Sequence, residues 1–361
     1  MPLSVDPDIA LAQTLPVDFY LRNEFYQQSK EKIFARTWQF VGDTDQVRDP
    51  GWVTPINLLE QFMNEPLILV KDKENTIRCL SNVCTHRGNL IIEKPCQLND
   101  LRCKYHGRRF HLSGKFASMP EFKEVRNFPT EADNLTSLPL FNWGKWLFTS
   151  LHQSHTAEVF FKEMIERTRW MHLDQFTFRP DLSKDYLVDA NWALYCENYL
   201  EGFHIPFVHA ELNSVIDYGT YSVELFPFSS LQVGMAKEGE LSFDLPPTSP
   251  DFGKRVASYY FWVFPNLMFN FYPWGLSINV INPVGAGRTK VKFLSYVLDE
   301  SKLRQGAGAD LHKVELEDED IVQNVQKGIR SRFFKFGRYS VTRETGTHHF
   351  HRLIAEFMNQ S

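Results

Sequence analysis

Two short motifs built from cysteine and histidine constrain this chain more than any other feature of its sequence. The segment Cys84–His86 has the pattern C-x-H, and the segment Cys103–His106 has the pattern C-x₂-H. Each motif offers one thiolate and one imidazole, and both groups are common metal ligands in proteins. The chain must therefore bring two loops face to face if the four side chains share one metal centre.

Two kinds of metal centre use these ligands, and the order of the ligands differs between them. In a Rieske [2Fe–2S] centre, two cysteines hold one iron and two histidines hold the other. A C₂H₂ zinc finger uses the same ligand types but places a cysteine pair before a histidine pair. Here each motif contributes one of each, and Gly88 and Gly107 allow backbone amides to approach cluster sulfur. The pattern favours the iron–sulfur cluster, with zinc as the alternative.

A second group of candidate metal ligands lies about a hundred residues further along the chain. His204 and His209 are separated by Pro206, which interrupts a helix, so we expect one histidine to end a helix and the other to follow the bend. Two imidazoles and one carboxylate form the facial triad of non-heme Fe(II) oxygenases. The third ligand should then be an Asp or a Glu elsewhere in the chain.

Candidates for this third ligand are concentrated in one acidic run, which contains Glu315, Glu317, Asp318, Glu319 and Asp320. Carboxylates at the start of a helix are also typical of a solvated first turn, because the helix dipole favours negative charge there. The residue types alone do not choose among the five side chains.

In this order, the two motif sets resemble those of the catalytic α subunits of Rieske non-heme iron oxygenases, also called ring-hydroxylating oxygenases. The resemblance extends over roughly residues 30–355. It implies two cofactors, a [2Fe–2S] Rieske cluster and a mononuclear Fe(II) bound by His204 and His209. The implied ligands of the cluster are Cys84, His86, Cys103 and His106.

The same resemblance implies roles for three further residues. Asp318 stands shortly before the segment 326–328 (Q-K-G), as the ligand aspartate does in the family, with Asp320 as the alternative. Glu201 occupies the position of the carboxylate that links an iron-binding histidine to a Rieske histidine of the neighbouring subunit, and a surface glutamate is its plain alternative. Asn198 falls where some members carry an asparagine close to the iron, and a helix hydrogen bond is its alternative role.

The second cluster motif departs from the family pattern beside its ligands. Many members have Pro before the second histidine and Gly-Trp after it, whereas this chain has Lys104 before His106 and Arg108 and Arg109 after Gly107. We expect these cations to make the rim of the site basic. They would contact an electron donor or another subunit, or only aid solubility.

Length and composition are typical of a two-domain enzyme, since 361 residues exceed what one core usually covers. The net charge of −5 and the lack of a basic tract argue against a nucleic-acid partner. No long apolar run and no signal-peptide pattern occur, which predicts a cytoplasmic protein without a membrane partner. The segments 285–287 and 306–308 do not complete a dinucleotide fingerprint, so a nicotinamide is expected to bind a separate protein.

Three segments are expected: an N-terminal helical segment (1–42) packing on the catalytic domain, a small all-β Rieske domain (43–155), and a catalytic domain (156–361). Runs rich in β-branched and aromatic residues predict strands at 66–70, 140–148, 259–264 and 291–297. Helices are expected at 311–336 and 344–359. The predicted fold class is α+β, and the resemblance implies an antiparallel catalytic sheet around a helix, the helix-grip fold.

By resemblance, the chain is expected to be an oxygenase that uses O₂ and electrons from a separate NAD(P)H-dependent flavin or iron–sulfur reductase. A homotrimer is implied, in which the cluster of one subunit serves the iron of the next across Glu201. A glutamate there is similar to the choline, carnitine and betaine branch, which favours monooxygenation, N-demethylation or C–N cleavage of an N-methylated substrate. An aromatic ring-hydroxylating dioxygenase is the alternative, and a Rieske electron-transfer protein without oxygenase activity is the alternative of another class.

Aromatic residues of the second half of the chain suit both substrate classes, because rings attract quaternary ammonium groups and also pack against hydrocarbons. The rings expected near the site are those of Phe203, Phe207, Phe264, Phe269, Phe271, Tyr272 and Trp274. The histidines His348, His349 and His351 follow an expected helix start and are predicted to lie on the surface, with chelation of a metal as the alternative.

Overall fold

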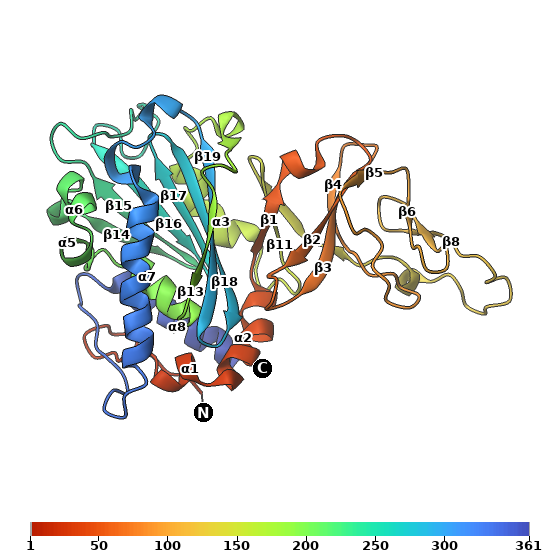
Figure 1. Ribbon diagram of the computed structural model, residues 1–361, viewed down its shortest axis with the longest axis horizontal. Helices are drawn as coiled ribbons and strands as arrows, with labels where there is room; N and C mark the ends of the chain where they lie inside the picture. Colours follow the sequence, from red (N-terminus) through yellow and green to blue (C-terminus); the bar gives the residue numbers. More distant parts are fainter. Residues whose placement is uncertain (1, 361) are drawn as a thin grey trace. The chain divides into compact units, whose positions relative to one another are not determined.

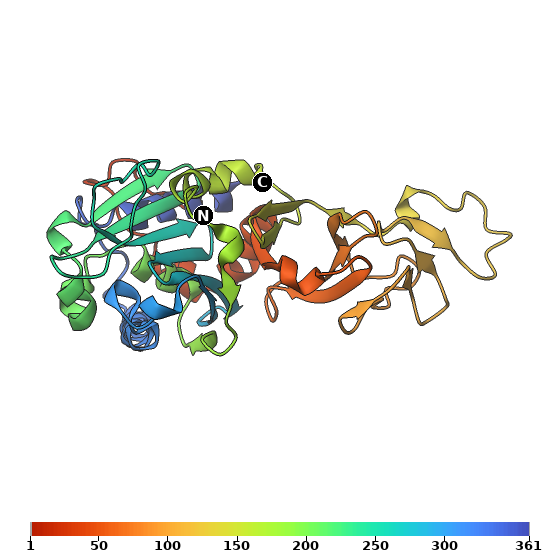
Figure 2. The same cartoon turned by 90° about the horizontal axis from the view of Figure 1, so that it is seen from above.

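The computed structural model describes residues 2–360 and divides the chain into two compact units (Figure 1, Figure 2). The smaller unit is Trp38–Gln153, and the larger unit combines the chain up to Thr37 with the chain from Ser154 onward. The expected helical segment 1–42 is wrong at its end, because Gln39–Asp43 forms a strand that pairs within the smaller unit.

The smaller unit contains three antiparallel sheets. The first has the strand order β1 (Gln39–Asp43), β11 (Trp146–Thr149), β10 (Leu140–Trp143). The second has the order β5 (Cys96–Gln97), β2 (Trp52–Leu58), β3 (Glu65–Lys71), β4 (Ile77–Ser81), β9 (Ser137–Leu138). The third has the order β6 (Leu101–Arg102), β7 (Arg109–Phe110), β8 (Phe116–Ser118). The strand pair expected at 140–148 is confirmed as β10 and β11.

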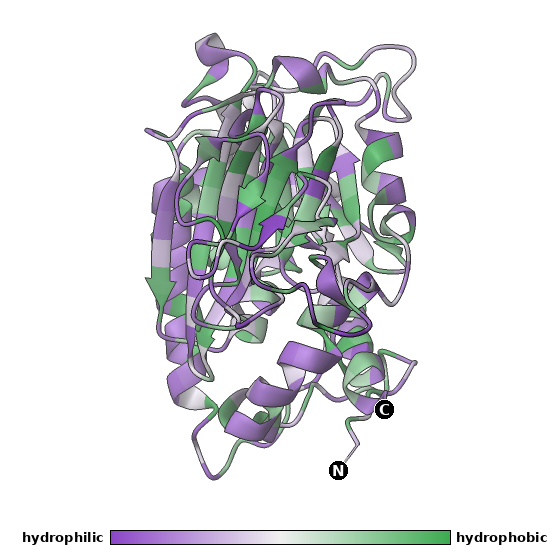
Figure 3. Cartoon of the chain, turned by 90° about the vertical axis from the view of Figure 1, so that its right-hand side faces the viewer, coloured by the Kyte–Doolittle hydropathy of each residue, from purple (hydrophilic) through white to green (hydrophobic). Residues whose placement is uncertain are grey.

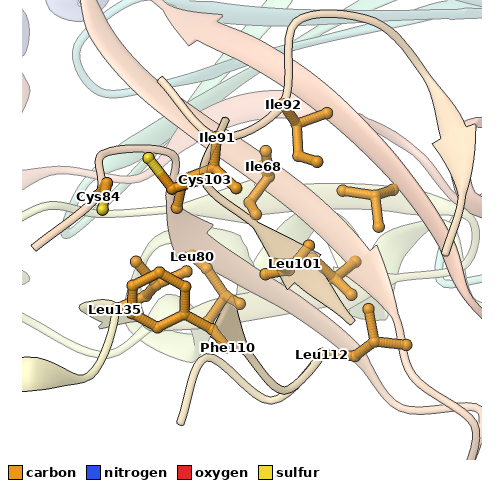
Figure 4. Packing of buried hydrophobic residues seen from close by; sticks show 12 residues of the cluster. Ile68, Leu80, Cys84, Ile91, Ile92, Leu101, Cys103, Phe110, Leu112 and Leu135 are labelled. Atoms are coloured by element: carbon orange, nitrogen blue, oxygen red, sulfur yellow. The ribbon is translucent and has the colours of Figure 1, made fainter. Parts of the chain in front are cut away.

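One apolar core joins the second and third sheets of this unit. Ile68 and Val70 on β3 are fully buried in it, as expected of β-branched side chains on the inner face of a sheet. Cys84 and Cys103 belong to the same core and lie at one end of it, with their sulfur atoms on the same side (Figure 4). Both candidate cluster thiols are therefore held by rigid packing.

The larger unit is built on one antiparallel sheet of eight strands. Its order is β12 (Thr177–Phe178), β19 (Arg288–Val297), β18 (Gly275–Gly285), β17 (Leu267–Tyr272), β16 (Val256–Val263), β15 (Ser229–Met235), β14 (Ser222–Phe226), and β13 (Lys184–Val188) also pairs with β19. The strands expected at 259–264 and 291–297 correspond to β16 and β19. Apolar residues follow these strands and polar residues lie mainly on the surrounding helices and loops (Figure 3).

Helices surround this sheet, which confirms the α+β class. They are α1 (Val17–Leu21), α2 (Asn23–Lys32), α3 (Ala157–Arg167), α4 (Trp192–Tyr199), α5 (Ile205–Val208), α6 (Ala210–Val215), α7 (Leu311–Gly328) and α8 (Thr345–Asn359). The helix α4 packs on β18 and on α7 (Figure 1). In the described part of the chain, no helix combines the length and the apolar character that a membrane span requires.

Two helices differ from the sequence-based expectation. The helix α7 ends at Gly328 and not at residue 336, because glycine is a weak helix former and the chain turns directly after it. In α8, His348 and His351 are buried, so their predicted place on the surface is wrong. They stand three residues apart on the inner face, where His351 Nε2 lies 3.0 Å from Glu197 Oε1 and His348 Nε2 lies 2.7 Å from a backbone oxygen.

The buried side chain of His349 is expected to lower the stability of the larger unit at acidic pH. Burial lowers the pKa of His349 to about 4, and its buried Nε2 has no hydrogen-bond partner among the described residues. The histidine of the unfolded chain therefore binds a proton near its usual pKa of 6.5 while that of the folded chain does not, so stability falls as the pH drops below 6.5. At pH 5 this loss amounts to about 2 kcal/mol relative to pH 7.5.

We expect the substitution His349→Leu to remove this part of the acid sensitivity. The measurement is urea unfolding of wild type and variant at pH 7.5 and pH 5, followed by circular dichroism. The difference in unfolding free energy between the two proteins should shift by about 2 kcal/mol in favour of the variant at pH 5. The control is His172→Leu, because His172 is exposed. If the difference in unfolding free energy between His349→Leu and wild type is the same at pH 5 and pH 7.5, the prediction is wrong.

Candidate functional site

Two loops of the smaller unit carry the candidate cluster ligands, and they have the same backbone geometry. The amide of Gly88 donates to the carbonyl of Cys84 (3.0 Å), and the amide of Gly107 donates to the carbonyl of Cys103 (3.1 Å). The glycines have φ angles of 71° and 77°, in the left-handed region that side chains disfavour. Asn89 Nδ2 also lies 3.7 Å from Cys103 Sγ. Each candidate cysteine ligand is thus followed by a turn that a backbone hydrogen bond closes at a glycine.

The four candidate ligands differ in exposure. Cys84 and Cys103 are buried, whereas His86 is half-buried and His106 is exposed. The two imidazole rings lie 4.8 Å apart between centroids, and the exposed ring of Tyr105 stacks on His106 at 3.7 Å. A metal held by the imidazoles would therefore lie nearer to the surface than one held by the thiols.

This arrangement fits a binuclear cluster better than a single zinc ion. Burial raises the pKa of Cys84, and the neighbouring Cys103 raises it further, so the thiolates need a cation beside them. One tetrahedral zinc would draw all four ligand atoms within about 4 Å of one another. Among residues 2–360, the one set of three or more such atoms within 4.8 Å of one another is found elsewhere, at His204, His209 and Asp318.

The prediction that Arg108 makes the rim basic is wrong. Its side chain is only 2% exposed, and its Nη2 lies 2.7 Å from Asp133 Oδ1. The guanidinium also packs over the rings of Phe110, Phe116 and Phe128, at 4.9–5.6 Å from the ring centroids. Lys104 and Arg109 do lie on the surface, where they pair with Glu93 and Asp100.

The larger unit brings the second set of candidate ligands together. Helix α4 ends at Tyr199, His204 precedes the short helix α5, and His209 follows it, so Pro206 separates the two histidines as expected. His204 Nε2 lies 3.1 Å from His209 Nε2, and Asp318 Oδ1 of α7 lies 3.0 Å from His209 Nε2 and 3.5 Å from His204 Nε2.

The outer nitrogens of both imidazoles face carboxylates. His204 Nδ1 lies 2.6 Å from Glu201 Oε1, and His209 Nδ1 lies 2.8 Å from Glu317 Oε2. Both rings therefore donate from Nδ1, which leaves the lone pairs of both Nε2 atoms pointing at each other and at Asp318. Three such atoms repel one another unless a cation lies between them, so the residues fit a metal ion.

The negative charges around His209 also favour a bound metal ion. Burial alone lowers the pKa of His209, but the hydrogen bonds and negative charges of Asp318 and Glu317 outweigh it and raise the pKa. The field that favours a proton there also favours a metal cation. Glu317 is a candidate site residue that the sequence did not single out from its acidic run, because its contact with His209 depends on the fold that places α7 beside this histidine.

Asn198 and Asp320 also have clear positions. Asn198 Nδ2 donates to Asp318 Oδ1 at 2.6 Å, so Asn198 contacts the candidate iron ligand directly. Asp320 is exposed on α7 and lies 3.4 Å from Asn324, not beside the histidines. The structure thus brings Asp318, and not its alternative, to the histidine pair.

A cavity of about 100 Å³ lies beside this triad. Its wall contains Glu201, Glu315 and Asp318 but no lysine or arginine within the described residues. Five tyrosines line it, namely Tyr195, Tyr199, Tyr221, Tyr260 and Tyr272. Burial is the main cause that raises their pKa, so the phenols stay neutral.

The aromatic set expected at the site is largely wrong. Of its seven members only Tyr272 lines the cavity. Phe269 and Phe271 alternate with Asn270 and Tyr272 along β17, so their rings point to the opposite face of the sheet. Phe203 and Phe207 are exposed, by 41% and 81%. Side chains alternate between the two faces of a strand. Counted from Tyr272, which lines the cavity, this alternation would have shown that Phe269 and Phe271 face away from it.

Comparison with known families identifies the class of this protein. Residues 37–129 match the Rieske [2Fe-2S] domain, and residues 169–360 match the catalytic domain of the ring-hydroxylating alpha subunits. The chain therefore belongs to the family of Rieske non-heme iron oxygenases. It has a Rieske [2Fe–2S] domain and the catalytic domain that binds a mononuclear iron in this family. The two alternatives, a zinc site at the cysteines and an electron-transfer protein without oxygenase activity, are therefore not supported.

Relatives of this chain include enzymes named for quaternary ammonium substrates. A chloroplastic choline monooxygenase of Arabidopsis thaliana is 30% identical over 97% of this chain and 84% of its own length. The carnitine monooxygenase oxygenase subunit of Escherichia coli (strain K12) is 26% identical over 96% of this chain and 94% of its own.

Solved structures share the same fold. A quaternary ammonium Rieske monooxygenase matches with a TM-score of 0.79 at 23% identity, covering 98% of this chain and 97% of the other. Naphthalene 1,2-dioxygenase matches with a TM-score of 0.73 at 18% identity, covering 97% and 93%. Because both substrate classes occur on this fold, the fold does not choose between them.

The position of Asp318 leads to a prediction about iron content. The substitution Asp318→Ala removes one of three converging ligand atoms, so we expect the purified protein to lose the mononuclear iron, one of three irons per chain. The visible spectrum of the cluster should stay unchanged, because its candidate ligands lie in the other unit. The measurement is iron content by mass spectrometry together with absorption spectroscopy.

Asp320→Ala is the matched control, since Asp320 stands on the same helix but is exposed. It should keep the full iron content. Loss of the cluster spectrum in Asp318→Ala, or loss of iron in Asp320→Ala, would show that the ligands are assigned wrongly.

Proposed function

We propose that this protein is the oxygenase component of a Rieske monooxygenase that hydroxylates or N-demethylates a quaternary ammonium compound. The observation that carries the proposal is the wall of the cavity, which combines tyrosine rings with carboxylates and has no lysine or arginine among its described residues. Aromatic faces attract a quaternary ammonium group by cation–π contacts, and this group needs no hydrogen-bond donor or acceptor.

The arrangement of the tyrosines supports this substrate class. The rings of Tyr199 and Tyr260 lie 6.4 Å apart and nearly perpendicular, and those of Tyr260 and Tyr272 lie 5.9 Å apart at 77°. An aromatic hydrocarbon carries no charge that could offset the buried carboxylate of Glu315 in this wall, and leaving that carboxylate without a counter-charge costs free energy. The names of the choline and carnitine monooxygenases among the relatives point to the same class.

The side chains of the triad have distinct tasks in this proposal. His204, His209 and Asp318 would hold Fe(II), which in a two-histidine, one-carboxylate site keeps positions open for O₂ chemistry. Glu201 and Glu317 accept hydrogen bonds from the Nδ1 atoms and thereby keep both Nε2 atoms available as ligands. Asn198 donates to Asp318 and so holds the carboxylate toward the histidines. The tyrosines would then present an N-methyl group to this centre.

We further propose that the electrons come from a separate NAD(P)H-dependent reductase and pass between subunits of a homotrimer through Glu201. Glu201 is only 14% exposed on its side chain and bonds to His204 and to two backbone amides, so its orientation is well defined. Beside it, Phe203 and Phe207 form an exposed aromatic pair with centroids 6.3 Å apart. One related structure is titled for inter-subunit electron transfer. A cytoplasmic location stays a prediction, since the plant relatives are chloroplastic.

A substitution in the exposed aromatic pair tests the proposed subunit contact. We expect Phe207→Asp to dissociate the trimer, because burying a charge in an apolar contact is unfavourable. Light scattering after gel filtration measures the mass, and Phe252→Asp is the control, since Phe252 is also exposed, by 59%. A wild-type monomer, or a Phe207→Asp protein that stays trimeric, would contradict the proposed interface.

The substrate proposal is tested by turnover. The iron-loaded protein is supplied with NADH and a surrogate reductase, and products from a panel of quaternary amines and aromatic hydrocarbons are identified by mass spectrometry. We expect oxygenated or demethylated product from a quaternary amine, coupled to O₂ uptake, and none with the Asp318→Ala protein. Product from aromatic compounds alone would assign the enzyme to the ring-hydroxylating dioxygenases instead.

A further inference from the structure

One carboxylate in the cavity wall has a role that the triad does not explain. Glu315 is 2% exposed, lines the cavity, and stands one helical turn before Asp318 on the same face of α7. Its Oε2 accepts a hydrogen bond from the hydroxyl of Tyr195 at 2.5 Å. Its Oε1 is buried and has no hydrogen-bond partner within the described residues. A buried carboxylate oxygen without a partner costs free energy, which a ligand with a donor group would offset.

In the part of the chain that the structure describes, no cationic side chain forms an ion pair with Glu315. The neighbouring cation on α7, Lys313, is exposed and pairs with Glu211 at 2.5 Å. Burial raises the pKa of Glu315 strongly, and the nearby charges of Asp318 and Glu319 raise it further. The hydrogen bond from Tyr195 acts in the opposite direction and stabilises the charged form. A ligand cation would complete this site.

The tyrosines of the wall leave the role of acceptor to Glu315. The hydroxyl of Tyr199 donates to Asn270 Oδ1 at 2.8 Å, and that of Tyr221 donates to Gln232 Oε1 at 3.2 Å. Their hydroxyl groups are thus engaged inside the protein, and their ring faces remain for the N-methyl groups. A quaternary nitrogen carries no N–H, so a donor for Glu315 Oε1 must sit on another part of the substrate.

We propose that Glu315, positioned by Tyr195, determines the substrate specificity by accepting a hydrogen bond from a hydroxyl group of a cationic quaternary amino alcohol. This inference rests on the proposed function and narrows it. A ligand cation in the cavity would favour the charged form of Glu315, and this charge repels a carboxylate, so zwitterions of the betaine type bind less well. A cation that lacks the hydroxyl group leaves Oε1 unpartnered and binds less well than the alcohol.

The experiment compares three probes of similar size: (2-hydroxyethyl)trimethylammonium, ethyltrimethylammonium and carboxymethyl-trimethylammonium. Affinity is measured by calorimetry on the iron-loaded protein without reductase, and kcat/KM is measured with reductase. For wild type we expect the alcohol to exceed both other probes by at least about tenfold, the effect of one hydrogen bond to a charged acceptor. In Glu315→Gln the preference for the alcohol over the other two probes should fall to within about threefold.

Two further variants separate specificity from folding. Tyr195→Phe keeps the carboxylate but removes the hydrogen bond that orients it, so the preference for the alcohol should fall by an intermediate factor. Glu319→Gln is the matched control, because Glu319 stands on the same helix and does not line the cavity. It should keep the wild-type preference. Iron content and cluster spectrum are checked for each variant.

The outcomes are distinguishable. If quaternary amines are oxygenated but Glu315→Gln keeps the wild-type order of the three probes, the role of Glu315 is overturned and the proposed function stands. If wild type prefers the carboxylate probe, the role of Glu315 is likewise overturned. If no quaternary amine binds or reacts, the proposed function fails, and the inference about Glu315 fails with it.

Discussion

The convergence of His204 Nε2, His209 Nε2 and Asp318 Oδ1 is the arrangement on which the rest of the larger unit depends. Three atoms with lone pairs lie within 3.5 Å of one another, which is stable only around a cation. The protein holds them there with rigid elements, because two ligands flank the short helix α5 and the third stands on α7. Asn191 at the start of α4 ties these segments together, since its amide donates to Gln326 Oε1 of α7 at 2.7 Å.

The two centres are built by different means. In the Rieske domain, each cysteine is followed by a local turn that closes on a glycine, so the geometry of each loop is encoded within a few residues. The catalytic triad instead joins positions more than a hundred residues apart, and it depends on the packing of α4 against α7. Outer carboxylates then orient the imidazoles, which makes Glu201 and Glu317 as important for ligand geometry as the ligands themselves.

Burial determines the role of several charged side chains, and this role cannot be inferred from the residue type alone. Arg108 is surrounded by aromatic rings and neutralised by Asp133, so it is part of the Rieske core and not of its surface. Glu315 is equally buried and lines the cavity, but one of its oxygens has no hydrogen-bond partner within residues 2–360. Arg108 has a carboxylate of the protein as its counter-charge, whereas the partner of Glu315 is the neutral hydroxyl of Tyr195, so a ligand cation would stabilise the charged form of Glu315. This contrast separates the two side chains functionally.

The sequence by itself determined the two metal-binding motifs, the α+β class and the family, because cluster ligands and the histidine pair are local patterns of C-x-H, C-x₂-H and His-x₄-His. The strands β3, β16 and β19 also followed from short runs of β-branched and aromatic residues. Asp318 could be preferred to Asp320 only through the family pattern, since both stand in one acidic run.

Only the tertiary structure decided which side chains form the cavity and which charges are buried. The rings of Tyr199, Tyr221 and Tyr260 meet from separate elements, and no spacing along the chain relates them. Phe269 and Phe271 looked equivalent to Tyr272 in the sequence, yet the pleat of β17 turns them to the other face. Local patterns report backbone geometry and ligand chemistry, but burial and contact depend on packing between distant segments, which a single sequence does not display.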